Sequence, residues 1–186
     1  YYNSGQYELA KVIFEKRVAQ NPSDLKSIEY LGDIQSQYKN WDKAISYYKL
    51  LISKNPNQAN YFFKYGGAMG MKAAESNKLS AFLMVDDIKS AVEKAIQLNP
   101  KHIEARWVLI EVYIQLPAIL GGSQEKAIEY SNELLKISPV DGYLSKGRIY
   151  EYYKKYTLAE SQYQKAIVVG NSKNCYQKLA NLYQNK

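Results

Sequence analysis

The sequence predicts an all-α protein built from repeated pairs of helices, and three observations carry this prediction. The chain has 186 residues, of which 46% are hydrophobic, and this suffices for one substantial folded unit. A spacing of 12 residues between a small residue and a helix-stopping residue recurs along the chain. A second motif, with bulky residues around a small one, precedes later copies of the first. Together these motifs indicate one helical unit that is repeated several times.

The 12-residue spacing begins at a small residue in the second helix of each unit and ends where that helix stops. Proline usually marks the stop, because it lacks the N–H group that the next helical hydrogen bond needs. The third copy begins at the larger Ile88, and the fifth ends at Asn171 in place of proline. The five copies span residues 10–22, 44–56, 88–100, 127–139 and 159–171.

The second motif starts the next unit about ten residues after each stop and predicts the first helix of that unit. Its spacing is bulky-x2-bulky-small-x2-bulky, as in "IEYLGDI" around Gly32 and "YLSKGRIY" around Gly147. We expect each small residue to let the two helices of a pair approach closely, Gly32 beside Ala44 and Gly147 beside Ala159. Tyr48, and its counterpart in the fifth unit, then fill the gap toward the neighbouring pair.

These motifs resemble the tetratricopeptide repeat (TPR), a 34-residue unit of two antiparallel helices, and the resemblance covers nearly the whole chain. It implies a right-handed superhelical solenoid of about five repeats plus a C-terminal capping helix, in a single array over residues 1–186. The expected units are a truncated repeat that lacks its first helix (1–24), a repeat (25–58), a repeat with an insertion of about ten residues (59–102), a repeat with an insertion of about five residues (103–139), a repeat (140–173) and the capping helix (174–186).

Both insertions fall between the two helices of a unit. In the first, Leu79, Phe82 and Leu83 recur with helical spacing. We therefore predict that the second helix of this unit extends backward by two or three turns, with a cap near Ser76 or Asn77. Such an insertion is either tolerated growth of a surface connection or a rim that contacts a ligand.

The second insertion is predicted to be a loop. Pro117 ends the preceding helix, Gly121 and Gly122 turn the chain, and Ser123 caps the next helix. The same two alternatives, loop growth and a ligand-contacting rim, apply to it.

Motifs for enzyme chemistry are lacking, so we predict that the chain is not an enzyme. Its one histidine, His102, and its one cysteine, Cys175, belong to repeats that lie well apart along the array. We expect a solvated His102 and a structural Cys175. Asp86 and Asp87 are adjacent and point apart on a helix, so they form no catalytic pair. We predict no metal ion and no cofactor.

Apolar runs stay well below the roughly 18 residues of a membrane span, so we expect a soluble chain without membrane insertion. The sequence does not decide between cytoplasm and periplasm, because residues upstream of Tyr1, including a leader, would not be visible in it. The net charge of +7 is concentrated in residues 140–186, which carry 8 basic and 3 acidic groups. These lysines scatter around the predicted helices and form no stripe, so we expect no nucleic acid partner.

In the TPR family the first helices line a concave groove that receives a peptide, and the resemblance implies such a groove here. Its predicted character is acidic at one end, apolar in the middle and mixed toward the basic end. We expect aromatic rings to be the anchors, unless either ring packs into the core. The acidic end argues against the TPR domains that clamp a chaperone's C-terminal carboxylate. The groove candidates are Glu29, Asp33, Phe63, Met71, Trp107, Glu111, Arg148 and Tyr152, with Trp107 and Phe63 as the anchors.

The predicted function is a non-catalytic scaffold that binds a peptide or partner protein in this groove. One alternative is capture of a small apolar or amphipathic ligand, as in TPR-like accessory proteins of bacterial solute transport. Another is homo-oligomeric assembly through the truncated N-terminal repeat. A closed pocket beside Phe82 would favour the ligand, an open groove with exposed Trp107 the peptide, and a dimer contact near Tyr7 and Phe14 self-association.

Overall fold

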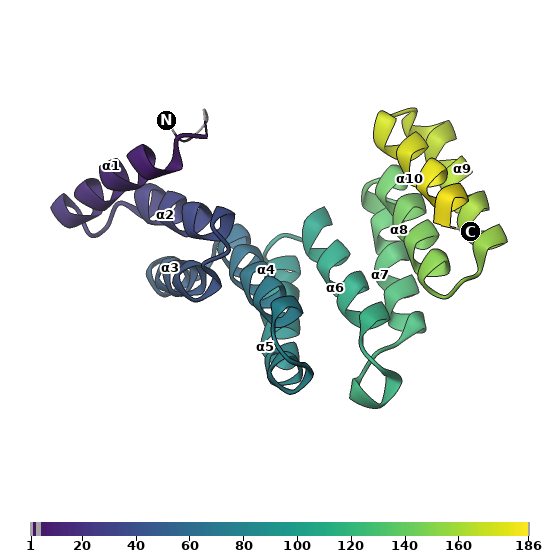
Figure 1. Ribbon diagram of the computed structural model, residues 1–186, viewed down its shortest axis with the longest axis horizontal. Coiled ribbons are helices and arrows are strands. Elements are labelled where there is room, and N and C mark those ends of the chain that lie inside the picture. The colour runs from purple at the N-terminus through teal and green to yellow at the C-terminus, as the bar shows by residue number, and fades with distance from the viewer. Residues whose placement is uncertain (1, 3–4, 186) are drawn as a thin grey trace. The chain divides into compact units, whose positions relative to one another are not determined.

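The computed structural model describes residue 2 and residues 5–185, and every regular element in this part of the chain is a helix (Figure 1). The all-α prediction is confirmed. The helices, in chain order, are α1 (Tyr7–Gln20), α2 (Leu25–Gln37), α3 (Trp41–Lys54), α4 (Ala59–Glu75), α5 (Lys78–Leu98), α6 (Ile103–Gln115), the 3-10 helix η1 (Ala118–Leu120), α7 (Gln124–Ile137), α8 (Pro139–Tyr152), α9 (Tyr156–Gly170) and α10 (Lys173–Asn185).

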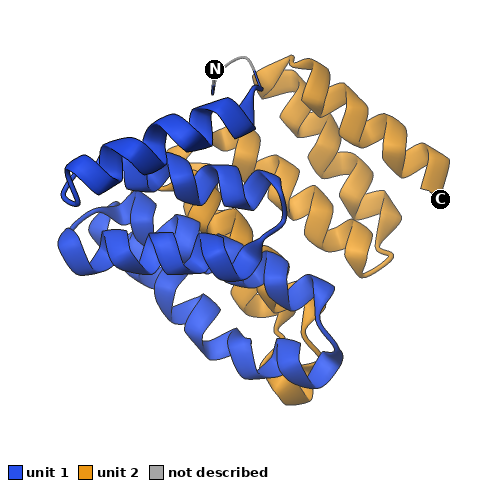
Figure 2. Ribbon diagram, turned by 60° about the vertical axis from the view of Figure 1, so that its left-hand side comes forward, with its two compact units in different colours: residues 1–100 blue, residues 101–186 orange. Residues whose placement is uncertain are grey.

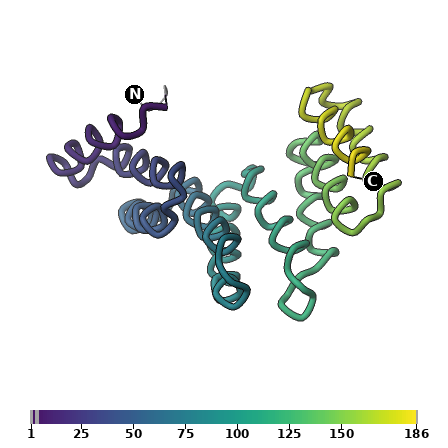
Figure 3. Tube along the Cα trace, in the orientation of Figure 1, coloured from purple at the N-terminus to yellow at the C-terminus, as the bar shows by residue number. Residues whose placement is uncertain are grey.

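Two compact units make up the chain, residues 1–100 with α1–α5 and residues 101–186 with α6–α10 (Figure 2). We call them unit 1 and unit 2. Within each unit, helices that follow one another in the chain pack against one another, and short connections join them (Figure 3). The repeat spacing did not predict this division, since it continues through residue 100 without a break.

Each unit has a hydrophobic core of its own, which forms where its helix pairs stack. Stacking is required because a single pair cannot bury its apolar stripe alone. The core of unit 1 includes Ile28, Ala44, Tyr48, Leu51, Tyr61 and Ala68. The core of unit 2 includes Leu144, Ala159, Tyr163, Ala166, Cys175 and Leu182.

Two glycines allow the close approach of the paired helices that the sequence predicts. A Cβ atom on Gly32 would lie 2.6 Å from Cε1 of Tyr48, and one on Gly147 would lie 2.3 Å from Cε1 of Tyr163. These distances are too short for any larger residue. The tyrosine ring therefore lies directly on the glycine of its own pair while it also contacts the core shared with the next pair.

Helix starts follow the capping residues that the sequence predicts. Asn77 caps α5, because its Oδ1 accepts the backbone N–H of Ser80 at 2.9 Å. Ser123 caps α7 in the same way, with its Oγ accepting the N–H of Lys126 at 3.2 Å. Pro139 is the first residue of α8, where the missing N–H costs nothing. Both predicted caps are confirmed.

The first insertion lengthens both helices of its pair, whereas we expected only the second to grow. α2 ends five residues after Gly32, but α4 ends nine residues after Gly66, one turn later. α3 begins three residues before Ala44, and α5 begins ten residues before Ile88, two turns earlier. The expectation was incomplete because "GAMGMKAAE" is itself helical up to Glu75. The insertion is therefore a helical hairpin.

The second insertion is a tight connection between α6 and α7. It contains the short 3-10 helix η1, which the prediction of a plain loop missed. Gly121 has φ +89°, which suits glycine, and a Cβ on Gly122 would lie 1.8 Å from the carbonyl oxygen of Leu116. Both glycines are thus needed to turn the chain into α7.

At the C-terminal end, α10 closes the core of unit 2. It begins at Lys173, one residue before the expected start. Cys175 is fully buried, with its Sγ 3.2 Å from the hydroxyl oxygen of Ser172. The opposite side of α10 is polar and exposed.

Candidate functional site

In unit 1, α2 and α4 share a cluster of polar side chains. The Lys64 ammonium donates to Oε1 of Glu29 at 2.6 Å and to both carboxylate oxygens of Asp33 at 2.7 and 2.8 Å. Asn60 donates a further hydrogen bond to Glu29 at 3.1 Å. The hydroxyl of Tyr48 donates to Asp33 at 2.8 Å. Glu29 and Asp33 are thus brought together as predicted, but both carboxylates already have partners.

The predicted acidic end of the groove needs correction, because one lysine lies between the two acids. Lys64 and Asn60 were missed, because the inward positions of this repeat were inferred by rotating away from the packing residues, and this gave Phe63 in place of its neighbour Lys64. The signal that could have identified Lys64 is its positive charge, which lies close to one repeat length after the negative charges of Glu29 and Asp33.

The other two candidates in unit 1 lie farther along α4. Phe63 is half-buried, and Met71 is 48% exposed near the C-terminal end of the helix. They are two turns apart and are not in the polar cluster. Their role in binding stays a prediction.

In unit 2, α6 and α8 present a second polar cluster. Arg148 donates two hydrogen bonds to Glu111, from Nε at 2.8 Å and from Nη2 at 3.0 Å. Its guanidinium also lies over the ring of Tyr152, 5.7 Å from the centroid. Burial opposes the charge of Arg148, but the hydrogen bond and charge of Glu111 outweigh it and raise the pKa of Arg148. Glu111, Arg148 and Tyr152 therefore form one cluster, in which the guanidinium of Arg148 is held by the other two side chains.

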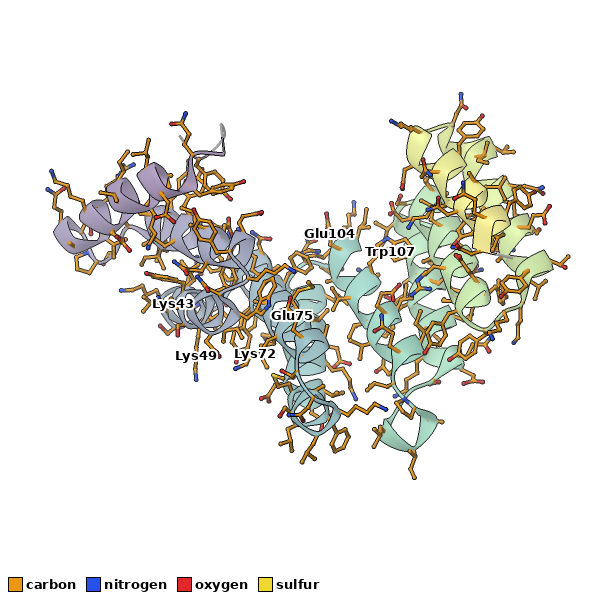
Figure 4. All side chains as sticks on the ribbon, viewed as in Figure 1. Lys43, Lys49, Lys72, Glu75, Glu104 and Trp107 are labelled. Carbon is orange, nitrogen blue, oxygen red and sulfur yellow. The ribbon has the colours of Figure 1, made fainter. Side chains whose placement is uncertain are left out.

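Trp107 lies one turn before Glu111 in α6 and therefore on the same side of that helix. Figure 4 labels its side chain on α6. Its indole N–H donates to Oδ1 of Asp141 at 3.0 Å, and its ring packs partly against the core of unit 2. The side chain is half-buried. Asp141 was missed, although it lies one repeat length of 34 residues after Trp107. Trp107 is thus half-buried and held by a hydrogen bond, and its role as an anchor stays a prediction.

A cleft of about 400 Å³ lies where the second insertion meets the C-terminal end of α8. Tyr152 and Tyr153 form one wall, with their ring centroids 5.3 Å apart in a T-shaped pair. Ile114, Leu116 and Pro117 supply apolar surface. Along α6 and α8, the cleft comes directly after the cluster of Glu111 and Arg148, so one strip of surface contains both.

A larger cleft, of about 950 Å³, lies on the surface of unit 1 between α3, α4 and α5. Its apolar lining includes Ile52, Phe62 and Tyr65, and Lys49 and Asp87 are among its charged residues. Phe82 is not part of it and is 42% exposed. The cleft is open, so it does not match the closed pocket beside Phe82 that would favour a small ligand.

Self-association through the N-terminal helix stays a prediction. α1 exposes an apolar stripe formed by Leu9, Val12 and Ile13. Tyr7 and Phe14, which we expected at a dimer contact, instead contribute to aromatic contacts within unit 1, with Tyr38 and Tyr30 respectively.

The single histidine is buried, so the expectation of a solvated His102 was wrong. Its Nδ1 accepts the backbone N–H of Ala105 at 3.3 Å and thereby caps α6. Its carbonyl oxygen accepts a hydrogen bond from Arg106 at 3.0 Å. These contacts at the first turn of α6 give His102 a structural position.

The described residues offer neither a metal site nor a membrane-spanning helix. No group of three or more His, Cys, Asp and Glu side chains in the described ranges could hold a metal ion. Likewise, none of the helices in this part of the chain has the length and apolar character needed to cross a membrane.

Solved structures share this arrangement over nearly the whole chain. TTC0263, a thermophilic TPR protein of Thermus thermophilus, superimposes with a TM-score of 0.78 at 19% identity, covering 98% of this chain and 93% of its own. The chain has the tetratricopeptide-repeat fold. A TPR protein from Parabacteroides merdae matches with a TM-score of 0.73 at 16% identity, over 97% of this chain and 67% of its own.

A third TPR structure, YrrB, is described as having an unusual peptide-binding site. It matches with a TM-score of 0.63 at 15% identity, over 93% of this chain and 82% of its own. No protein-family model matches the sequence, and no curated protein matches it either. At these identities the TPR likeness concerns the fold.

Proposed function

We propose that this TPR chain is a non-catalytic interaction module that binds an extended peptide along α6 and α8 of unit 2. The observation that carries the proposal is the fixed Arg148, held by Glu111 and supported by the ring of Tyr152. A cation whose position is already fixed loses little conformational entropy when it binds a peptide carbonyl or carboxylate.

The rest of the strip supplies apolar contacts on both sides of this cation. Trp107 lies on one side, and the cleft with Tyr152 and Tyr153 lies on the other. Aromatic side chains and arginine dominate the binding energy of protein interfaces. The peptide-binding site described for YrrB, which has the same fold, supports peptides as the ligand class. We therefore expect a peptide with an apolar or aromatic side chain for the cleft and an acceptor group for Arg148.

The test is a selection of peptides from a displayed library on the intact chain, followed by measured affinities for its variants. Arg148→Ala and Tyr152→Ala are expected to weaken the selected peptides at least tenfold, about 1.4 kcal/mol each. Arg17→Ala and Tyr176→Ala are the matched controls, since both side chains are exposed outside the strip. Selected peptides that bind both strip variants as tightly as the wild type would contradict the proposal.

A second candidate function is binding of a small amphipathic molecule in the open cleft of unit 1. Its volume of about 950 Å³ and its lining of aromatic and charged side chains favour this candidate. A screen for compounds that raise the melting temperature, repeated on Phe62→Ala, tests it. Compounds that stabilise the wild type and the variant equally would place their binding elsewhere.

A further inference from the structure

α10 repeats on its surface the pattern with which α8 packs against α9. In each of the two helices, two tyrosines flank a small residue, which comes four residues after the first tyrosine and three before the second. The three side chains therefore share one face of the helix. These positions are Tyr143, Gly147 and Tyr150 in α8, and Tyr176, Ala180 and Tyr183 in α10.

This face is covered in α8 and open in α10. In α8, the ring of Tyr163 from α9 lies on Gly147, and the two flanking tyrosines pack against the core of unit 2. In α10, Tyr176 and Tyr183 are each 52% exposed, and Ala180 between them is exposed as well. α10 thus presents to solvent a face that in α8 packs against a second helix.

The two exposed rings of α10 are held in place from within unit 2. The hydroxyl of Tyr176 donates to Oδ1 of Asn171 at 2.9 Å, and the hydroxyl of Tyr183 donates to Oε1 of Glu160 at 2.8 Å. α10 itself is anchored in the core through Leu182, which is fully buried. A partner helix would therefore meet side chains that already have their positions, and this lowers the entropic cost of binding.

α1 is a helix of the kind that would cover this face. In α3 and α9, the second helices of their pairs, an alanine is followed four residues later by the aromatic ring that lies on the glycine of the first helix. α1 has an alanine and an aromatic ring at the same spacing. The two residues are Ala44 and Tyr48 in α3, Ala159 and Tyr163 in α9, and Ala10 and Phe14 in α1.

The side of α1 that would meet a first helix is open. Phe14 is half-buried, whereas the tyrosines at this position in α3 and α9 are buried, and Ile13 beside it is 42% exposed. Seven residues after the alanine, Leu51 in α3 and Ala166 in α9 are fully buried, but the side chain of Arg17 in α1 is 61% exposed. Within the described residues, α1 packs against α2 and has no first helix of its own pair.

From this complementarity we infer that α10 of one copy of the chain packs against α1 of a second copy, in the manner of α8 and α9. The two helices together complete a helix pair, in which Phe14 lies on Ala180. Since Ala180 has one more methyl group than the glycine of α8, the two helices lie slightly farther apart than α8 and α9. The inference does not depend on the peptide proposal, which concerns α6 and α8.

The contact joins different surfaces of the two copies, so it is heterologous, and each added copy brings a further free α1 or α10. The association is expected to be weak and concentration-dependent, because one helix pair per contact buries less than the roughly 1,200 Å² of a standard interface. Sedimentation velocity of the intact chain, from micromolar to millimolar concentration, measures it.

Two blocked variants remove one surface each. Ala180→Arg and Ile13→Glu are each expected to raise the dissociation constant at least tenfold, because each places a charge inside the contact. Ala74→Arg in α4 and Leu83→Glu in α5 are the matched controls, since both residues are exposed outside α1 and α10. Both controls leave the dissociation constant unchanged.

Mixing the two blocked variants tests the pairing of different surfaces. Ala180→Arg retains an intact α1, and Ile13→Glu retains an intact α10, so each alone stays largely monomeric while the mixture forms a one-to-one dimer and nothing larger. The dissociation constant of this dimer is expected to lie within about threefold of the wild-type value. A mixture that stays monomeric overturns the inference, and so does either blocked variant if it associates as the wild type does.

A substitution at Arg17 tests the register in the opposite direction. Arg17→Leu gives α1 the residue that α3 has at Leu51, so it is expected to lower the dissociation constant severalfold. The double variant Arg17→Leu/Ala180→Arg should stay largely monomeric, and this distinguishes the helix pair from unspecific apolar contact. An unchanged dissociation constant in Arg17→Leu, or a gain that persists in the double variant, overturns the register and with it the inference.

Two further outcomes would overturn the inference. One is a wild type that stays monomeric at millimolar concentration. The other is an association that survives both blocked variants and is lost in Leu83→Glu, because this would place the contact on the exposed apolar residues of α5. Circular dichroism confirms that each variant is folded, as expected for changes at exposed positions.

Discussion

At the residue scale, the contact between a tyrosine and a glycine allows close packing in one helix pair of each unit, α2 with α3 in unit 1 and α8 with α9 in unit 2. The ring of Tyr163 lies on Gly147, and its hydroxyl donates to Oε2 of Glu151 at 2.7 Å. Tyr48 lies on Gly32 in the same way and donates to Asp33. Each tyrosine thus fills the core with its ring and reaches a carboxylate at the edge of the core with its hydroxyl.

Gly147→Ala is expected to destabilise the chain by about 1–3 kcal/mol, since the added methyl group overlaps a ring that is fully buried. Gly67→Ala is the matched control. It lies in the middle of α4 with open space around its Cβ position, so alanine there should stabilise the helix by about 0.5–1 kcal/mol. Urea denaturation followed by circular dichroism measures both. Equal effects of the two substitutions would refute the steric explanation.

The same tyrosines predict a loss of stability at alkaline pH. Burial, most of all, and the adjacent Glu151 raise the pKa of Tyr163 well above its usual value. Burial also raises the pKa of Tyr48, with Asp33 adding to it against the opposing hydrogen bond from Ser36. A pKa raised by folding stabilises the protein fully below the unfolded value of about 10, and this stabilisation is lost as pH rises toward the folded value.

We therefore expect the free energy of unfolding to fall above pH 10 by up to about 1.4 kcal/mol per pH unit for each such tyrosine. Lysines also titrate in this range, so the comparison is between the wild type and Tyr163→Phe. The variant should show a shallower dependence on pH in urea denaturation from pH 9 to 11. Parallel curves for the two proteins would exclude this role for Tyr163.

At the element scale, the turns inside two helix pairs each contain one lysine in the left-handed conformation. Lys39 follows α2 and Lys154 follows α8, and both have φ +56°, in the left-handed region. A third residue with positive φ, Gly5 just before α1 (φ +74°), has no Cβ atom and therefore carries no such strain. Glycine adopts this conformation without the steric cost that a Cβ adds. Replacing either lysine with glycine is therefore expected to stabilise its turn.

Lys154→Gly is expected to be about 1 kcal/mol more stable than Lys154→Ala, since both remove the lysine and only glycine removes the Cβ. Thermal unfolding of the two variants gives the comparison directly. If alanine proves the more stable residue at this position, the turn does not adopt the left-handed conformation in solution.

The ends of helices could be predicted from the sequence where neighbouring residues determine them. The caps Asn77 and Ser123 followed from residue type and position, because capping involves only the first turn of a helix. The division of the first insertion between α4 and α5 did not follow, since "GAMGMKAAE" suits a helix and a connection equally. In the candidate sites, Glu111 and Arg148 were placed on one surface, but Lys64 was missed, because contacts between successive first helices tolerate an offset from the repeat length.

At the scale of the whole molecule, the division into two units predicts how the chain unfolds. Each unit has its own core and one of the two tryptophans, Trp41 in unit 1 and Trp107 in unit 2. In repeat proteins, contacts are largely local, so a change in one part weakens distant parts less. A substitution in unit 2 should therefore affect mainly the tryptophan of that unit.

The experiment places Gly147→Ala in two single-tryptophan backgrounds, Trp41→Phe and Trp107→Phe, and follows fluorescence during urea denaturation. We expect the midpoint reported by Trp107 to fall clearly and the midpoint reported by Trp41 to change little. Equal shifts of both midpoints would mean that the chain unfolds as one cooperative unit.

Because Cys175 is buried, its thiol can react with a reagent in solution only when the surrounding helices open. Since it is the sole cysteine, a thiol-specific reagent would modify one known position, between α9 and α10. The rate of modification in native buffer then measures how often this end of the chain opens, without any denaturant. Cys175 thus reports the rate at which the core around α9 and α10 becomes exposed to solvent.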